Sequence, residues 1–451
     1  MTNLNQDKIY KPTFDYIDDG KEHGILSKFN PGTQTLPKGY QVAPKFKALD
    51  CDIILEKDMP VKLRDGVTIY TDIYRPVTDE QVPVIMAWSP YGKSAGIAPR
   101  YENIFGIIGL KDSIVSGLEK FEGPDPAYWC NHGYAICNPD ARGIAHSEGD
   151  VSMMGTQEGQ DGYDVIEWLA AQSWSNGKIA LSGTSYLAFS QWYIAAEQPP
   201  HLAAINPTEG LSDGYRDIAM RGGIPDADFV ERLQANHVNV NDNQREDVTE
   251  EMIQYPLANN PVWEDKIVKF DQITVPAYVV ASYSNTLHTN GTFRAWRQMA
   301  SKQKWLRIHN IQEWPDYYDE MNTEDRRKFF DYFLKGIENG WDQTVPVRYA
   351  MLDMEGGDQI NLPATQFPPL NVDYQQFHLN GKTRTLDQQP TKQDVPVTYM
   401  PEVGPGKASF IKTFAEKTKL IGYPKVHLNV AAKKADDMEL FVTIQKLDQN
   451  G

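Results

Sequence analysis

Three short, continuous apolar runs are the feature that most constrains how this 451-residue chain can fold. They lie at residues 82–92, 132–143 and 177–186, and each is typical of a strand covered on both faces. Between the second and third runs, residues 160–172 carry apolar residues at helical spacing. Strand, helix and strand in this order form right-handed βαβ units, so we predict a parallel sheet. Later runs of the same kind continue this sheet at 202–210, 275–285 and 304–310.

Changes in pattern divide the chain into five segments. Residues 1–50 are rich in Pro, Gly and Lys with little periodicity, and we expect a surface arm. The α/β core occupies 51–212 and resumes at 266–345. The interruption at 213–265 reads as short polar helices without a strand, which predicts a helical cap over the active-site edge of the sheet. Residues 346–451 form the fifth segment.

Short β-type runs separated by Pro, Gly and Asp fill residues 346–451. This pattern predicts a β-sandwich of the jelly-roll type. The chain reaches Gly451 before a jelly roll would have enough strands to close. We therefore expect the domain to continue beyond this residue or to be completed elsewhere.

Charge and cysteine usage exclude several classes of protein. The formal net charge of −17 repels phosphate backbones, which argues against a nucleic-acid partner. No apolar run approaches the roughly 20 residues that span a bilayer, and the polar N-terminal sequence predicts a cytoplasmic protein without a membrane partner. Cys51, Cys130 and Cys137 show neither metal spacing nor a framework of pairs. No metal or organic cofactor is implied, and a homo-oligomer is compatible with the sequence.

A sharp turn carrying Ser185 follows the run at 177–184 and precedes an amphipathic segment at 189–198. This context is typical of a nucleophile elbow, whose strained backbone lifts the serine oxygen above the edge of the sheet. The backbone N–H of Tyr186 then points to where a negative oxygen would develop. An ordinary tight turn is the alternative, because Leu187 stands where a strict elbow has glycine.

Five motifs stand out along the chain: RDGVTIYTDIYRP (64–76), SPYGK (89–93), EGPDPAYW (122–129), DARGIAHSEG (140–149) and WSNGKIALSGTSYLA (174–188). Together with the closing β region, they resemble the cocaine-esterase-like hydrolases of the CocE/NonD type. That family is related to the Xaa-Pro dipeptidyl peptidases and the α-amino acid ester hydrolases. The resemblance runs from about residue 53 to the end of the chain.

The resemblance implies an α/β-hydrolase core, an inserted helical cap and a C-terminal jelly roll. It also implies hydrolysis of an ester or amide through an acyl-enzyme on Ser185. The family's PY tyrosine, matched by Tyr91, would donate its phenol O–H to the oxyanion. The family elbow reads G-x-S-Y-x-G, and this chain has Ala188 at the last position. We expect slightly looser helix packing there and an intact nucleophile.

The histidine of an α/β-hydrolase triad follows the last core strand, in the chain order serine, acid, histidine. His309 lies directly after the run KWLRI, and we expect it to be the base. His288 is the alternative. The family's histidine falls a few residues further on, near Glu313 in this chain.

The triad acid is expected after the strand at 275–285, where the family has aspartate and this chain has Asn285. We expect Asn285 to orient His309, although an amide cannot stabilise an imidazolium by charge. Exchanging the acid for its amide has cost about four orders of magnitude in a serine protease. Glu209, after the preceding strand, and Glu313 or Asp316 are the alternative carboxylates.

The motif at 140–149 offers Asp140, Arg142, His146 and Glu148 together, yet His146 precedes the serine, which is the wrong order for this fold. We interpret the Arg-Gly turn as a structural tie made by a charge-assisted pair.

We therefore predict a serine hydrolase acting on a small-molecule ester or amide. Two alternatives stay open. The first is a catalytically impaired hydrolase fold that serves as a binding protein, because the expected carboxylate is missing. The second is an Xaa-Pro dipeptidyl-peptidase-like aminopeptidase, whose pocket would hold a free ammonium through carboxylates such as Asp226, Asp228 and Glu231 of the cap.

Overall fold

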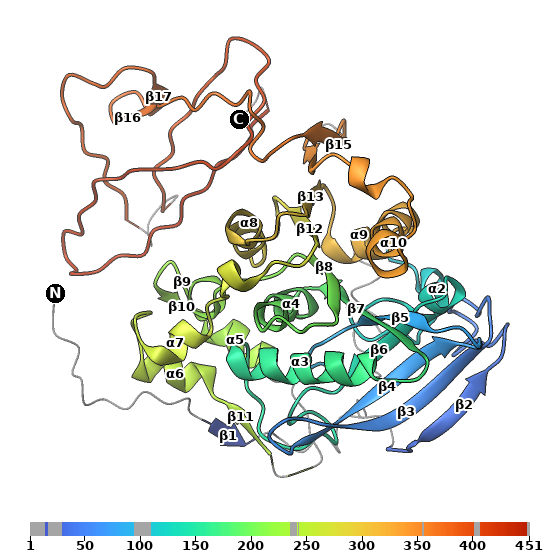
Figure 1. Cartoon of the computed structure of the whole chain (residues 1–451). Coiled ribbons are helices and arrows are strands. Elements are labelled where there is room, and N and C mark those ends of the chain that lie inside the picture. Colours follow the sequence, from blue (N-terminus) through green and yellow to red (C-terminus); the bar gives the residue numbers. More distant parts are fainter. Residues whose placement is uncertain are drawn as a thin grey trace. The chain divides into compact units, whose positions relative to one another are not determined.

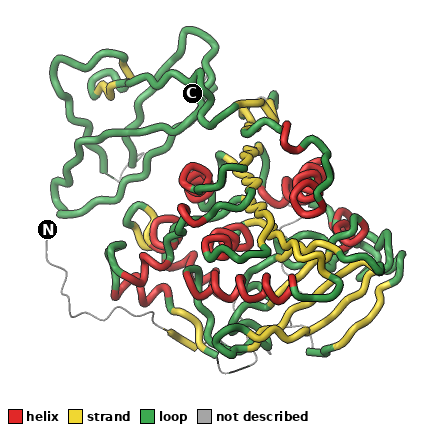
Figure 2. The backbone as a smooth tube through the Cα atoms, in the orientation of Figure 1, coloured by secondary structure: helices red, strands yellow, loops and turns green. Residues whose placement is uncertain are grey.

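The computed structural model describes residues 14–16, 29–93, 110–234, 241, 243–353, 356–400 and 406–448. The chain divides into two compact units, residues 1–363 and 364–451. Figure 1 shows helices and strands alternating through the first unit, and Figure 2 shows that the second is mostly loop.

An eleven-stranded sheet forms the first unit, in the order β15-β14-β13-β12-β8-β7-β5-β6-β4-β3-β2. Its strands are β2 (Gly32–Leu36), β3 (Ile53–Lys62), β4 (Thr68–Pro76), β5 (Val82–Met86), β6 (Ala135–Pro139), β7 (Ser175–Thr184), β8 (Leu202–Thr208), β12 (Ala277–Ser282), β13 (Lys304–His309), β14 (Val347–Met351) and β15 (Gln359–Ala364). Pairing is parallel from β6 through β5, β7, β8, β12 and β13 to β14, and antiparallel among β2, β3, β4 and β6. The predicted parallel sheet is confirmed.

Every residue of β5, β6 and β12 is buried, as their continuous apolar sequences require. Figure 1 shows helices on both faces of the sheet. On one side α3 (Thr156–Ala170) and α4 (Tyr186–Ala196) pack together and against β7. On the other, α2 (Pro126–Asn131) meets α10 (Glu320–Lys335), with the rings of Trp129 and Phe330 5.6 Å apart. This is the α/β core expected from the sequence.

Short elements interrupt the sheet between β8 and β12. They are the π-helix η3 (Gly214–Ala219), β9 (Met220–Arg221), β10 (Ile224–Pro225), α5 (Ala227–Gln234), β11 (Gln244–Glu246), α6 (Val248–Gln254), α7 (Pro261–Asp265) and the 3₁₀ turn η4 (Phe270–Gln272). Helices dominate, as expected for a cap, but three short strands also occur. β9 and β10, of two residues each, pair as a short antiparallel hairpin, and β11 pairs with β1 (Phe14–Tyr16).

The N-terminal segment is more structured than the predicted surface arm. β2 adds an antiparallel edge strand to β3, and β1 reaches the inserted region through β11. Four residues of β2 are exposed, which explains why its sequence has no apolar periodicity. No helix within the described ranges is both long and apolar enough to cross a membrane.

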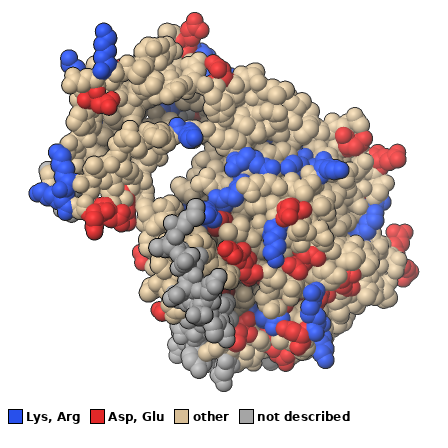
Figure 3. All heavy atoms as spheres, turned by 60° about the vertical axis from the view of Figure 1, so that its left-hand side comes forward, with Lys and Arg blue, Asp and Glu red and all other residues tan. Residues whose placement is uncertain are grey.

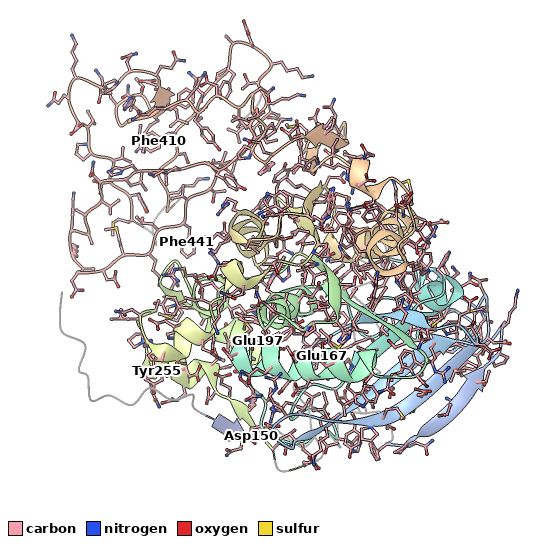
Figure 4. All side chains as sticks on the ribbon, in the orientation of Figure 1. Asp150, Glu167, Glu197, Tyr255, Phe410 and Phe441 are labelled. Atoms are coloured by element: carbon pink, nitrogen blue, oxygen red, sulfur yellow. The ribbon has the colours of Figure 1, made fainter. Side chains whose placement is uncertain are left out.

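The region predicted as a β-sandwich is divided between the large sheet and the second unit. β14 and β15, at the start of the predicted β domain, join the large sheet of the first unit instead. Within 364–451 the described residues form one ladder, β16 (His378–Asn380) with β17 (Thr385–Asp387). The runs near 425–434 and 439–448 enter no described ladder, and Phe441, labelled in Figure 4, is 80% exposed. Besides this ladder, an isolated bridge pairs Thr385 with Ile411 among the described residues.

Charged side chains of both signs are interspersed over the face drawn in Figure 3. On that face the acidic residues are therefore mixed with basic ones rather than gathered in one anionic site.

Candidate active site

Ser185 occupies the strained turn between β7 and α4. Its backbone lies at φ 59° and ψ −118°, a conformation that costs a non-glycine residue energy and that marks functional sites. Gly183, at φ 152°, must be glycine, because a Cβ there would lie 2.3 Å from the Cβ of Leu187. The Ser185 N–H is fixed by the carbonyl of Thr208 at 3.1 Å. The turn has the backbone geometry predicted for a nucleophile elbow.

Ala188, which replaces the last glycine of the family elbow, is fully buried. A Cβ on Gly210 would approach the Ala188 Cβ to 3.0 Å and the Trp192 Nε1 to 2.9 Å. The helix therefore packs closely at this point, and the looser packing that we expected is not seen. Glycine at 210 supplies the space that alanine at 188 takes.

His288 is the histidine beside the serine. Its Nε2 lies 3.2 Å from Ser185 Oγ, within reach for proton transfer. It stands at the start of α8 (Thr289–Gln298), after β12, and is 3% exposed. We expected His309 in this place and kept His288 as the alternative.

Asn285 shapes the turn that presents His288. Its Oδ1 accepts hydrogen bonds from the backbone N–H groups of Leu287 at 3.0 Å and His288 at 3.1 Å. This is an Asx turn, a common local use of asparagine before a helix. The expected contact from Asn285 to His309 is absent from the hydrogen bonds of the described residues, because the Asn285 oxygen is taken by the backbone.

Glu209 is the carboxylate between the two histidines. It directly follows β8, has a positive φ of 52°, and is 1% exposed. Its Oε2 lies 3.7 Å from His288 Nδ1 and its Oε1 2.5 Å from His309 Nε2. One imidazole thus lies close to each oxygen of the carboxylate. Burial alone would raise the pKa of Glu209, but His288 and His309 outweigh it and lower the pKa to about 2.

His309 lies at the end of β13, behind Glu209, and does not line the pocket that holds Ser185. Its Nδ1 is 3.9 Å from Asp316 Oδ1, and the guanidinium of Arg307 holds that carboxylate through a bond of 2.9 Å. Burial would raise the pKa of Asp316, but Arg307 and His309 lower it. The last core strand thus places its histidine against carboxylates rather than against the serine.

A pocket of about 330 Å³ opens over Ser185 and His288. Its other lining residues are mostly aromatic or aliphatic: Tyr91, Phe121, Glu122, Phe189, Leu211, Phe229, Arg232, Leu233, Leu287, Glu313 and Trp314. Phe229, Arg232 and Leu233 belong to α5, so the inserted region supplies part of the wall. An apolar pocket with few polar groups beside a strained serine is the form expected of a small-molecule site.

The two groups expected at the oxyanion lie beside Ser185. Tyr91 lines the pocket, and its ring packs edge-on against Phe121 at 5.5 Å and Tyr186 at 5.7 Å. The Tyr186 hydroxyl donates to the buried Glu158 at 3.2 Å. As the first residue of α4, Tyr186 has a backbone N–H without a partner inside the helix.

A buried charge cluster anchors the loop that carries Tyr91. Lys93 Nζ lies 2.5 Å from Asp58, 3.5 Å from Asp140 and 3.6 Å from Asp72. The Lys93 backbone N–H also donates to Asp140 at 2.6 Å. On the other side, Lys120 Nζ donates to the carbonyl of Ser89 at 3.0 Å and that of Pro139 at 2.6 Å.

The carboxyl groups of Glu122 and Glu313 line the pocket. The sequence analysis named Glu313 only as an alternative triad acid and did not single out Glu122 as a pocket residue. Trp314 Nε1 donates to Glu122 at 2.8 Å. Burial raises the pKa of Glu122 well above its usual value, and burial together with the charge of Glu209 raises the pKa of Glu313. Glu122 lies in the quoted EGPDPAYW motif, and its positive φ of 65° has no signal in the sequence.

The motif at 140–149 is structural, as the sequence suggested. Arg142 binds Asp161 through two bonds of 2.7 Å and reaches Asp65 at 2.8 Å. His146 packs on Phe29, with ring centroids 4.6 Å apart. Among the described residues no group of His, Cys, Asp and Glu is arranged to hold a metal ion.

Residues 65–312 match the X-Pro dipeptidyl-peptidase (S15) family, and residues 339–451 match the C-terminal non-catalytic domain of X-Pro dipeptidyl-peptidases. The chain is similar to a cocaine esterase from Rhodococcus sp. (strain MB1 Bresler), 29% identical over 37% of this chain and 26% of the esterase. It is also similar to a putative Xaa-Pro dipeptidyl-peptidase from Bacillus anthracis, 25% identical over 61% of this chain and 51% of the relative.

A crystal structure of a CocE/NonD family hydrolase from Staphylococcus aureus is 34% identical, with a TM-score of 0.73. The alignment covers 81% of this chain and 65% of that hydrolase. The chain thus spans between about a quarter and two thirds of the length of these relatives. The S15 match covers more than half of the chain, so this protein belongs to the CocE/NonD-type, X-Pro dipeptidyl-peptidase (S15) family.

Proposed function

We propose that this protein is a serine hydrolase that cleaves a small ester or amide through an acyl-enzyme on Ser185. The observation that carries the proposal is the 3.2 Å separation of Ser185 Oγ and His288 Nε2 at a strained elbow. His288 is the proposed base, Glu209 the acid, and Tyr91 with the Tyr186 N–H the oxyanion donors. This assignment uses two residues that the sequence offered as alternatives.

The proposed chemistry proceeds in two halves. Ser185 Oγ attacks the acyl carbon while its proton passes to His288 Nε2, and the carbonyl oxygen gains the negative charge. The C–O or C–N bond then breaks, and His288 returns the proton to the leaving alcohol or amine. Water then attacks the acyl carbon while its proton passes to His288, the bond from the acyl carbon to Ser185 Oγ breaks, and His288 returns the proton to Ser185 Oγ as the acid leaves. Glu209, kept ionised by its two histidines, stabilises the imidazolium in each half.

The pocket supports an apolar or aromatic acyl group as substrate. Most of its lining side chains are apolar. The aminopeptidase alternative needs carboxylates for a free ammonium, and Glu122 and Glu313 are the pocket acids available. Because burial raises the pKa of both carboxyls, keeping them ionised to hold an ammonium costs more in this pocket than in water. The ester reading is therefore preferred.

A fluorophosphonate probe tests the nucleophile. We expect labelling of the protein, loss of labelling in Ser185→Ala, and a fall of about 10⁴-fold or more in p-nitrophenyl acetate hydrolysis in His288→Leu. Ser190→Ala is the matched control, since Ser190 lies on the same helix and bonds the Trp88 carbonyl at 3.0 Å. A folded protein that takes no label would favour the impaired binding protein. Faster cleavage of an Ala-Pro amide than of the ester would favour the aminopeptidase.

A further inference from the structure

Glu209 is held from two sides, by one histidine that faces the pocket and one that does not. His288 lines the pocket beside Ser185, whereas His309 lies on the opposite oxygen of the same carboxylate, 2.5 Å away. The proposed triad needs only the first histidine. A second imidazole, 3% exposed and in contact with the acid, is a buried titratable group that the proposed chemistry does not use.

We propose that His309 is a positioning residue that fixes the Glu209 carboxylate so that its other oxygen faces His288. This inference rests on the proposed function, since it assigns Glu209 and His288 to the triad. His309 does not line the pocket, so its route to the proposed triad is through Glu209.

The sheet itself brings the three groups together. Glu209 follows β8, His288 follows β12, and His309 ends β13, and these three strands are neighbours in the parallel part of the sheet. Ser282, the last residue of β12, is paired in register with His309. The Glu209 N–H bonds the Val280 carbonyl at 2.8 Å, which fixes its backbone to β12. The backbone of Glu209 is thus tied to β12, and the orientation of its carboxylate is left to side-chain contacts.

The contact between His309 and Glu209 matters because the contact between Glu209 and His288 is long. Glu209 Oε2 is 3.7 Å from His288 Nδ1, beyond a hydrogen bond, and must approach as the imidazolium forms. A carboxylate free to rotate would lose this alignment. With Oε1 held at 2.5 Å by His309, rotation about the last side-chain bond is blocked and Oε2 stays on the His288 side.

The charges around the pair favour this role. His309 lies between Glu209 and Asp316, and Asp316 is already bound by Arg307 of β13 and by Asn322 Nδ2 at 3.0 Å. From α9 (Glu313–Tyr318), the carboxyl of Glu313 is the further acid near Glu209. Asp316 is thus bound by other groups, and the shorter contact of His309 is the one with Glu209.

The test measures p-nitrophenyl acetate hydrolysis by the full-length wild-type protein and by two variants, His309→Leu and His309→Gln. Glutamine is similar in size to histidine and can still donate a hydrogen bond. Because His309 does not line the pocket, we expect KM to stay within about two-fold and kcat to fall about 10²-fold in the leucine variant, the scale of a misplaced catalytic group. Glutamine, which can donate to Glu209 from nearly the same place, is expected to recover most of that loss. His201→Gln is the matched control, because His201 pairs with the α3 residue Glu167, labelled in Figure 4, at an exposed site.

A double-mutant cycle separates positioning from general damage. If His309 acts through Glu209, His309→Leu costs nothing further in a Glu209→Gln background, whereas independent effects would multiply. Multiplying effects, an unchanged kcat in His309→Leu, or a raised KM with unchanged kcat would each overturn the inference. So would activity retained in His288→Leu and abolished in both His309 variants, because His309 would then be the base.

The two proposals fail in different ways. Labelling and turnover that persist in Ser185→Ala would remove the proposed function. Loss of both in Ser185→Ala together with wild-type behaviour of His309→Leu would remove this inference alone. Urea unfolding of each variant separates a lost fold from lost chemistry, and the glutamine variant keeps the test decisive where leucine does not fold.

Discussion

Asp72 belongs to the buried charge cluster that anchors the loop carrying Tyr91, and it is the carboxylate of that cluster that we expect can be neutralised with a gain in stability. Three carboxylates, of Asp58, Asp72 and Asp140, share this site with two ammonium groups, of Lys93 and Lys120. Asp72 is among the two carboxylates farther from Lys93 Nζ, at 3.6 Å against 2.5 Å for Asp58. One negative charge is in excess, and burial makes it costly.

Asp72→Asn should therefore stabilise the protein at neutral pH. Burial raises the pKa of Asp72 from 3.8 to about 6, although Lys93 lowers it. Because the folded pKa is the higher one, the native state binds the proton more tightly, and this stability is present below pH 3.8 and lost as the pH rises through 6. The shift corresponds to at most about 3 kcal/mol at neutral pH, at 1.36 kcal/mol per pKa unit. The Asn Oδ1 can still accept from the Asp58 N–H, a bond of 2.9 Å.

Urea unfolding followed by tryptophan fluorescence measures this difference. We expect Asp72→Asn to exceed the wild type by about 2–3 kcal/mol near pH 7.5 and by only about 1 kcal/mol near pH 4.5, because most of the titration between 3.8 and 6 lies above that pH. Asp50→Asn is the control, because Asp50 forms an exposed pair with Lys47 at 3.8 Å, and a change of less than about 0.5 kcal/mol is expected. A loss of about 3–5 kcal/mol near pH 7.5 would refute the reasoning, since it would mean that Lys93 needs the Asp72 charge.

Two further substitutions probe the packing around the elbow and its supporting loop. Gly210→Ala places a Cβ 2.9 Å from Trp192 Nε1 and 3.0 Å from the Ala188 Cβ, and should lower the free energy of unfolding by about 1–3 kcal/mol and slow fluorophosphonate labelling; unchanged labelling would contradict it. Arg142→Lys loses the two-point contact with Asp161 and should cost about 1–3 kcal/mol in urea unfolding; a change below about 0.5 kcal/mol would show that one ammonium suffices.

The sequence predicted the core because its evidence is local. The buried strands are short apolar runs, and the elbow is one strand–turn–helix unit around Ser185. The histidine was harder to choose. His288 and His309 follow adjacent parallel strands, so both reach the same edge of the sheet, and which imidazole meets the serine depends on side-chain direction.

Asn285 shows the same limit. An asparagine after a strand can orient an imidazole or close an Asx turn, and the sequence SNTLH is compatible with both. Here it closes the turn. Glu209 was an alternative acid because of its place after β8, but its position between two histidines is a tertiary property.

The C-terminal region illustrates a different limit. Its residues have strand composition, yet strand pairing is a long-range property that composition does not determine. One predicted strand joined the large sheet as β14, β15 joined it without having been predicted as a strand, and within 364–451 one short ladder forms among the described residues.

The helix α5 has a consequence for how selectivity could change. It comes from an insertion between two strands, and it supplies Phe229, Arg232 and Leu233 to the wall of the pocket. The proposed nucleophile, base and acid lie instead in the turns that follow strands β7, β12 and β8. Substitutions in α5 can therefore change the preference for the acyl group without changing the proposed catalytic residues.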